Sequence, residues 1–290
     1  MKERIQKVLA AAGVDSRRHI EQLVREGRIA VNGRTVERLP VMVDPASDKI
    51  SIDGDPVRLK AAAKEPLVYV LLNKPRNVYC TNVSQGEQRR AIDLLPRDFP
   101  RVYSVGRLDH DSRGLLILTN DGDLTHRLTH PKFEVLKTYL ATVEGQLTPE
   151  AVEKIQKGVW LADVRKGEGF RTGRAKIRVT QRNREQTSLE ITIGEGRNRE
   201  IRRLMAKVGH KVRDLIRIRF GPLKLEGVNN GKWRMLTPTE VNRLRAAGSV
   251  EHEPKAFAST VISTSAEKAG KRRAPASTVS GKNPNQLKKA

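Results

Sequence analysis

Two closely spaced aspartates, Asp109 and Asp111, stand in the segment VGRLDHDSRGLLILTNDG, residues 105–122. Aspartates in such a setting are most often turn or capping residues. Here Arg107 and Arg113 lie beside the pair and the whole chain is basic, so a carboxylate can stay ionised next to a phosphate-rich substrate. An ionised carboxylate in a fixed position can do nucleophilic or acid–base chemistry. These surroundings raise Asp109 above an ordinary turn residue.

The neighbouring elements place both carboxylates on a turn at the edge of a sheet. A strand ends near Val105, and the apolar run from Leu115 to Leu118 has the pattern of a buried strand. Similar strand patterns occur in LVYVLLN, TYLATVEG, KIRVT and SLEITIGEG. Helical patterns occur around residues 149–157 and 198–208. Because helices and strands do not alternate, we expect an α+β fold with a mostly antiparallel mixed sheet over residues 67–247.

Residues 1–60 have the pattern of a separate small module with two helices and a short sheet. The first helix has one apolar face, made of Ile5, Val8, Leu9 and Ala12. The second is expected to have Ser16 as N-cap and to end at Gly27, where a left-handed residue is favoured. Asn-Gly at residues 32–33 and Asp-Gly at residues 53–54 predict tight turns between short strands.

Positive charge dominates the chain. Its 56 lysines and arginines exceed its 33 aspartates and glutamates, which gives a formal charge of +23 and implies a polyanionic partner. Arg17 and Arg18 occupy the first turn of the second helix, where the helix dipole disfavours positive charge. We expect phosphate to bind beside the start of this helix, which would account for the two arginines.

The remaining features narrow the class of protein. We expect a cytoplasmic monomer, because the sequence has no membrane-length apolar run, no signal-peptide pattern and no coiled-coil heptads. Cys80, the single cysteine, has no partner for an internal disulfide or a zinc site, and we expect neither a metal nor a cofactor. Residues 61–66 are predicted to be a linker and residues 248–290 a disordered basic tail. Whether that tail attracts RNA or only aids solubility stays open.

The string GRLDHDSRGLLILTNDG resembles the signature of the RsuA family, pseudouridine synthases that act on ribosomal RNA. The resemblance implies that Asp109 is the catalytic nucleophile. HPKFEVLKTYL is similar to the second motif of this family, which implies that Tyr139, two residues after Lys137, packs against the target base. GEGRNREIRRLM is similar to the third motif, which implies that Arg202 pairs with Asp109.

Residues 4 to about 60 resemble the S4-type RNA-binding domain through RIQKVLAAAGVDSRR, REGRIAVNG and KISIDG. Lys74-Pro75, GRNREIRRL and LIRIRFG are most similar to the branch of the family that modifies RNA of the large ribosomal subunit, which implies 23S ribosomal RNA as the partner. The candidate RNA contacts in the two domains are Arg17, Arg18, Arg28, Asn32, Arg107, Lys137, Arg197 and Arg199.

Conversion of uridine to pseudouridine needs neither redox change nor nucleotide cofactor, in agreement with a sequence that has no P-loop or dinucleotide fingerprint. Asp109 could add to the ribose C1′ or to uracil C6, or could deprotonate the ribose, and the sequence leaves these routes open. The target uridine is also open. Three alternatives are a 16S ribosomal RNA pseudouridine synthase, a noncatalytic RNA-binding assembly protein, and a metal-dependent nuclease that uses Asp109, Asp111, Asp121 and Asp123.

Overall fold

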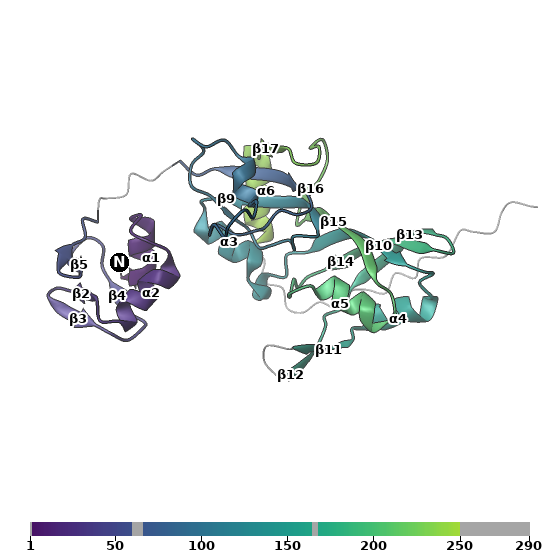
Figure 1. The fold of residues 1–290 in the computed structure, drawn as a ribbon, viewed down its shortest axis with the longest axis horizontal. Helices are drawn as coiled ribbons and strands as arrows, with labels where there is room; N and C mark the ends of the chain where they lie inside the picture. The colour runs from purple at the N-terminus through teal and green to yellow at the C-terminus, as the bar shows by residue number, and fades with distance from the viewer. Residues whose placement is uncertain (1, 60–65, 164–167, 250–290) are drawn as a thin grey trace, which may run out of the picture. The chain divides into compact units, whose positions relative to one another are not determined.

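The computed structural model describes residues 2–59, 66–163 and 168–249 (Figure 1). The N-terminal part contains helices α1 (Ile5–Ala11) and α2 (Arg17–Arg25). Its four-stranded antiparallel sheet has the order β3-β2-β5-β6, with bounds Arg34–Val36, Ile29–Val31, Ile50–Ile52 and Asp55–Pro56. A separate short pair joins β1 (Glu3–Arg4) to β4 (Met42–Val43). Side chains of both helices and of β2, β4 and β5 form one buried core.

The local signals in this part are confirmed. Ser16 is the N-cap of α2 and its hydroxyl accepts a hydrogen bond from the His19 N–H at 3.2 Å. Gly27 follows the helix with φ +68°. The turn residues Asn32 and Gly33 both have positive φ, 50° and 78°, as a two-residue turn between twisted strands requires.

The following part of the chain is built on a nine-stranded mixed sheet. Its main path runs β13-β14-β10-β15-β9-β7-β17, with bounds Lys176–Arg182, Gln186–Ile193, Lys137–Glu144, Val212–Phe220, Arg113–Thr119, Tyr69–Lys74 and Trp233–Met235. Off this path, β8 (Tyr103–Ser104) pairs with β9 and β16 (Leu223–Lys224) pairs with β15. The β9–β15 pair is parallel and the other described pairs are antiparallel.

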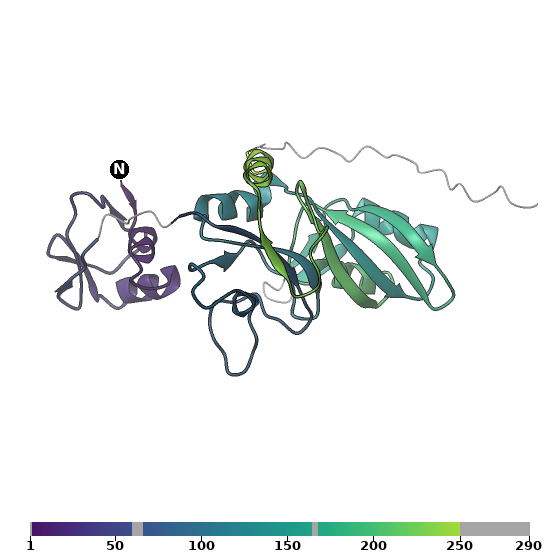
Figure 2. The ribbon, with the colours of Figure 1, turned by 90° about the horizontal axis from the view of Figure 1, so that it is seen from above.

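Helices cover both faces of this sheet (Figures 1 and 2). On β9, Leu116 and Leu118 join the core that contains residues of α4 (Pro149–Lys157) and α5 (Glu200–Lys207). The alternate residues Leu115 and Ile117 join a second core with α3 (Gly122–Thr129) and α6 (Pro238–Ala247). A strand buried on both faces reads as a continuous apolar run, which explains the sequence LLIL.

Smaller elements complete the description. The hairpin of β11 (Trp160–Asp163) and β12 (Glu168–Arg171) lies outside the main sheet, and η1 (Ala91–Leu94) and η2 (Pro131–Phe133) are short 3-10 helices. The predicted α+β class and mixed sheet are confirmed. The predicted linker 61–66 and tail 248–290 lie almost wholly outside the described residues. Within the described ranges, no helix is long and apolar enough to cross a membrane.

Candidate active site

The turn that carries Asp109 and Asp111 is fixed by hydrogen bonds from several directions. The Ser112 N–H donates to the Asp109 carbonyl at 3.1 Å, which closes the turn, and the Asn77 N–H donates to the His110 carbonyl at 2.7 Å. Strand β9 starts directly after this turn, so the sheet edge sets the position of both carboxylates. The turn expected from the sequence is therefore present.

Gly114 lets β9 approach β15 closely at this point. Its φ is +107°, and a Cβ atom here would lie 2.4 Å from the carbonyl oxygen of Arg217. Arg217 is also its register partner in the parallel pair of strands. The glycine after the Asp109 turn is thus required for the backbone contact that joins the turn to β15.

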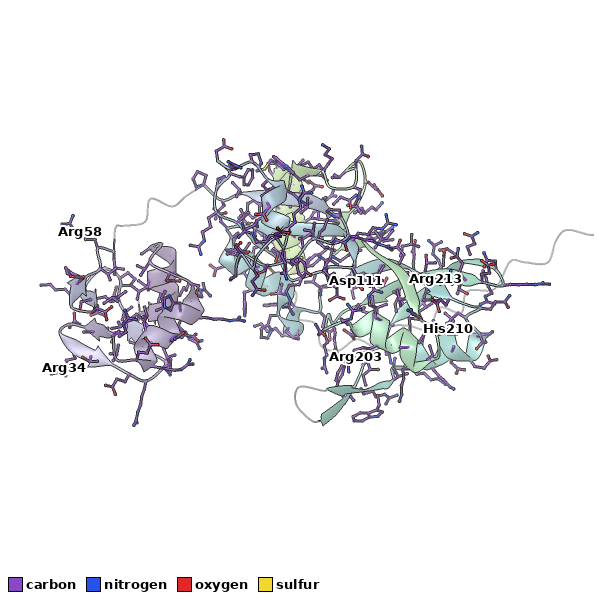
Figure 3. All side chains as sticks on the ribbon, in the orientation of Figure 1. Arg34, Arg58, Asp111, Arg203, His210 and Arg213 are labelled. Atoms are coloured by element: carbon purple, nitrogen blue, oxygen red, sulfur yellow. The ribbon has the colours of Figure 1, made fainter. Side chains whose placement is uncertain are left out.

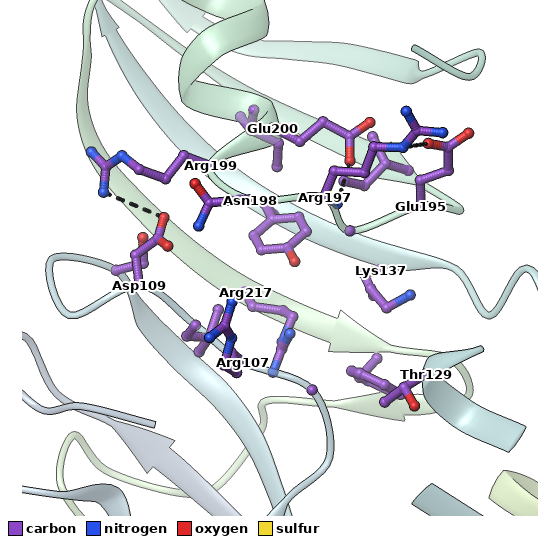
Figure 4. Close-up of a pocket in the computed structure, with 18 of the residues that line it drawn as sticks. Arg107, Asp109, Thr129, Lys137, Glu195, Arg197, Asn198, Arg199, Glu200 and Arg217 are labelled. Carbon is purple, nitrogen blue, oxygen red and sulfur yellow. Dashed lines mark hydrogen bonds and ion pairs between the residues drawn. The ribbon is translucent and has the colours of Figure 1, made fainter. Parts of the chain in front are cut away.

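Two arginines of the third motif reach the turn from the start of α5. The Arg199 Nη1 lies 3.5 Å from Asp109 Oδ2 (Figure 4). The same atom lies 3.2 Å from Asp111 Oδ1. The Arg202 Nη2 lies 3.2 Å from Asp111 Oδ2. Burial raises the pKa of Asp111, but the hydrogen bond from Arg199 and the charges of Arg202 and Arg199 outweigh it, so this pKa lies below its ordinary value.

The prediction that Arg202 pairs with Asp109 is wrong in this structure, because Asp109 contacts Arg199 instead. Arg199 has a left-handed backbone, φ 49°, as the N-cap of α5, and its side chain crosses to the Asp109 carboxylate. Arg202 lies one turn further along the helix and donates to the carbonyls of Val212 at 3.0 Å and Asp111 at 3.4 Å. Arg202 therefore binds the backbone of the turn as well as the Asp111 carboxylate, and Arg199 is the arginine that contacts Asp109.

A cavity of about 400 Å³ opens beside Asp109. Tyr139, on β10, is only 7% exposed and lines the same cavity, as the second motif leads one to expect. Apolar side chains of Leu108, Ile193, Leu215 and Phe220 also contribute to the wall. A carboxyl group, an aromatic ring and an apolar wall within one cavity suit a planar base.

Lys137 lines this cavity two residues before Tyr139. Its ammonium group donates to the carbonyls of Val135 at 2.9 Å and Gly194 at 3.3 Å. Burial, together with the charge of Arg217, lowers the pKa of Lys137 to about 8. The predicted RNA contact is thus a partly buried lysine whose ammonium group is already bonded to two backbone carbonyls.

The other predicted RNA contacts of this part differ in whether their side chains already bind other groups of the protein. Arg107 is exposed and lines the cavity. Arg197 forms an ion pair with Glu195 at 2.8 Å, and its guanidinium lies 3.9 Å from the ring centre of Phe170. Arg113, expected beside Asp109, is paired with Asp214 instead.

In the N-terminal part, Arg17 and Arg18 are exposed at the start of α2, as expected for contacts with phosphate. Arg28 is exposed but its guanidinium is hydrogen-bonded to Asp53, with Nε 2.8 Å from the carboxylate. Asn32 uses both ends of its amide inside the module, toward Asp48 and the Lys49 N–H. Arg28 and Asn32 would have to exchange these bonds for RNA.

A second hollow shares Arg199 with the first and continues from the turn onto β15. Its lining is mainly basic: Arg76, Arg199, Arg202, His210, Lys211 and Arg213, with Asp111 and Glu144 among them. Figure 3 labels three of the residues that line this hollow, Asp111, His210 and Arg213. This hollow was not expected from the sequence, because its residues come from separate loops and strands.

The four aspartates of the nuclease alternative do not assemble into a site. Asp121 is the N-cap of α3, and its carboxylate accepts from the Leu124 N–H at 2.9 Å, at the opposite end of β9 from Asp109. In the part of the chain that the structure describes, no group of three or more His, Cys, Asp or Glu side chains is placed to hold a metal ion.

Comparisons with known proteins agree with this geometry. Residues 68–207 match the family described as RNA pseudouridylate synthase, and residues 3–58 match the S4 domain. Ribosomal large subunit pseudouridine synthase B of Bacillus subtilis (strain 168) is 40% identical over 255 residues, which cover 88% of this chain and 100% of that protein. The protein of the same name from Haemophilus influenzae is 38% identical over 84% of this chain and 67% of its own length.

A solved structure of a pseudouridylate synthase superposes with a TM-score of 0.60 and 27% identity. The match covers 83% of this chain and 99% of the solved one. Together with the sequence matches, it shows that the chain belongs to the RNA pseudouridine synthase family, enzymes that isomerise uridine in RNA, and carries an S4 domain at its N-terminal end.

Proposed function

We propose that this chain converts a specific uridine of 23S ribosomal RNA to pseudouridine, with Asp109 as the nucleophile. The observation that carries the proposal is that Asp109 and Tyr139 line one cavity. The names of the Bacillus subtilis and Haemophilus influenzae relatives support 23S RNA as the substrate. The proposed enzyme is a cytoplasmic monomer.

In this proposal the target base leaves its stack and enters the cavity. Unstacking costs a few kcal/mol, which the ring of Tyr139 offsets in part. Asp109 then acts on the ribose C1′, on uracil C6 or as a base toward the ribose, and the uracil turns and rejoins through C5. Arg199 holds the carboxylate in place by its contact at 3.5 Å, and Arg202 acts as a positioning residue through the turn.

The two domains divide the work of binding. Phosphate contacts give affinity and position, whereas the cavity reads the base. We assign residues 1–60 to the first task and residues 67–247 to the second. The proposed RNA contacts are Arg17, Arg18, Arg28, Asn32, Arg107, Lys137, Arg197 and Arg199. The basic second hollow offers a path for the strand that flanks the target nucleotide.

The substrate is tested by incubating the purified protein, in EDTA and without cofactor, with unmodified 23S and 16S RNA. Pseudouridine is mapped by carbodiimide-dependent primer-extension stops. We expect one new stop in 23S RNA. A stop in 16S RNA alone would overturn the substrate, and no stop in either RNA or in precursor ribosomal particles would favour the noncatalytic assembly protein.

The Tyr139 hydroxyl is a candidate for the last proton transfer, the removal of the proton from C5. Tyr139→Phe keeps the aromatic face and removes the hydroxyl, so it separates stacking from proton transfer. We expect the variant to bind RNA normally and to accumulate unfinished product in a quenched time course. Full turnover by this variant would reject a role for the hydroxyl.

A further inference from the structure

Arg217 is a buried arginine within the LIRIRFG string, and the sequence motifs assign it no role. It lies on β15, directly opposite Tyr139 in the register of β10 and β15. Its side chain is only 2% exposed and is among the largest fully buried side chains of the chain. Arginine is almost never buried to this extent unless it is paired. Arg217 nevertheless lines the cavity that contains Asp109 and Tyr139.

The guanidinium group of Arg217 is only partly satisfied. Its Nε donates to the Leu115 carbonyl at 2.7 Å, but its buried Nη2 has no hydrogen-bond partner. No acidic side chain in the described ranges forms an ion pair with it. Arginine cannot lose its charge in a protein, so this cation stays charged inside the fold.

A second cation, Lys137, lies close to Arg217. Lys137 lines the same cavity, and the charge of Arg217 contributes to the low pKa of that lysine. The ring of Phe220 lies 5.1 Å from the guanidinium carbon and supplies a weak cation–π contact. Figure 4 shows Arg217 between Asp109 and Lys137. A buried cation with an unbonded hydrogen-bond donor, in a cavity that can hold a ligand, can stabilise negative charge on that ligand.

We propose that Arg217 donates a hydrogen bond to a carbonyl oxygen of the target uracil and stabilises the negative charge that the ring acquires during the reaction. This inference rests on the proposed function. When the C1′–N1 bond breaks, its electron pair moves to the ring and spreads over N1 and the carbonyl oxygens. The C1′–C5 bond then forms, C5 loses its proton and N1 gains one, so the isomerisation balances.

A base oxygen suits this position better than a phosphate oxygen. Arg217 is 2% exposed and lies beside the ring that faces the base. The exposed arginines of the cavity, Arg107, Arg197 and Arg199, are the ones within reach of a phosphodiester at the surface. A phosphate contact of Arg217 is therefore the outcome that the test must exclude.

The test compares Arg217→Met with Arg219→Met, the same change at an exposed position of the same strand. Single-turnover pseudouridine formation is measured at saturating enzyme, and RNA affinity by filter binding. We expect Arg217→Met to slow the reaction about 100-fold to 1,000-fold, as for loss of a donor to developing charge, while the RNA dissociation constant changes little. Arg219→Met should react at the normal rate.

Chemical rescue separates a direct role from a structural one. Guanidinium ion, at concentrations that leave the protein folded, should restore part of the rate of Arg217→Ala and none of the rate of Asp109→Asn. Arg217→Lys keeps the charge without the geometry and should remain slow. Arg217→Lys also replaces Arg217→Met in the rate measurement if the methionine variant shows no cooperative thermal unfolding.

Three results would overturn the inference. A normal rate with weakened RNA affinity would assign Arg217 to a phosphate, and a normal rate with normal affinity would leave it no part in the reaction. A slow rate that guanidinium does not restore, together with a lowered melting temperature for each variant, would make its role structural. If the wild-type protein forms no pseudouridine, the proposed function is refuted instead. In that case a melting temperature of Arg217→Met equal to or above that of the wild type would still mark the unpaired charge as part of a ligand site.

Discussion

Gly114→Ala tests whether the contact between β9 and β15 holds the catalytic turn in place. The new Cβ would lie 2.4 Å from the Arg217 carbonyl oxygen and 2.8 Å from the Arg217 nitrogen. Both atoms belong to the backbone, so no side chain can move aside. Because ordinary contact begins at 3.4 Å, the two strands must part by about 1 Å.

The expected loss follows from two effects. Overpacking costs about 1–3 kcal/mol, and a side chain at φ +107° adds strain of about 1–3 kcal/mol. The free energy of unfolding should therefore fall by about 2–6 kcal/mol, a large share of the stability of a domain. The turn with Asp109 precedes Gly114 directly, and a displacement of about 1 Å at the site can slow the reaction about 100-fold.

Urea denaturation followed by circular dichroism measures the stability, and single-turnover pseudouridine formation measures the rate under conditions where the variant is folded. Gly86→Ala is the matched control, because Gly86 has φ +56° but no atom within 4 Å of the added Cβ. It should lose only about 1–2 kcal/mol. If Gly114→Ala matched this control in both measurements, the close contact would not position the site.

Three further predictions concern charged groups. Arg199→Gln should slow the reaction about tenfold with little loss of stability. Arg202→Gln should lower the free energy of unfolding by about 1–3 kcal/mol, because Arg202, unlike Arg199, donates to the backbone carbonyls of Asp111 in the turn and Val212 on β15. Equal effects of the two variants in rate and urea midpoint would contradict this. Lys137 has a pKa of about 8 when folded against 10.5 when unfolded, so its unfavourable burial is fully present below pH 8 and disappears as the pH rises to 10.5. The difference in free energy of unfolding between Lys137→Met and wild type should therefore favour the variant more at pH 7 than at pH 10.5, by up to about 3 kcal/mol. If urea titrations gave the same difference at both pH values, the buried charge would be refuted. Lys211→Gln combined with Arg213→Gln should reduce the salt slope of RNA binding by about 2 and leave the saturated rate unchanged, and an unchanged slope would remove the second hollow from the RNA path.

The sequence was sufficient where local chemistry determines local structure. Ser16 and Gly27 mark the ends of α2 because capping and left-handed residues act within a few positions. The turn with Asp109 was likewise predictable, since polar residues separate two apolar strands there. The family motifs placed Asp109 and Tyr139, and the structure brings both to one cavity.

The long-range contacts were not predictable from local patterns. The wrong pairing of Arg202 with Asp109 arose because the motif fixes positions along α5 but not the left-handed backbone of Arg199. Arg217 was missed because an arginine within an alternating strand is normally assigned to the solvent side. Its burial depends on β15 lying between β10 and β9, segments from distant parts of the chain. The second hollow depends on the same arrangement.

The most direct test of the central claim compares Asp109→Asn with Asp111→Asn in single-turnover pseudouridine formation on 23S RNA. Both carboxylates lie on the same turn and both contact Arg199, so the pair controls for charge and fold. We expect Asp109→Asn to bind RNA but to form no pseudouridine, while Asp111→Asn still forms it at a reduced rate. Product formation by Asp109→Asn at the wild-type rate would show that another group is the nucleophile.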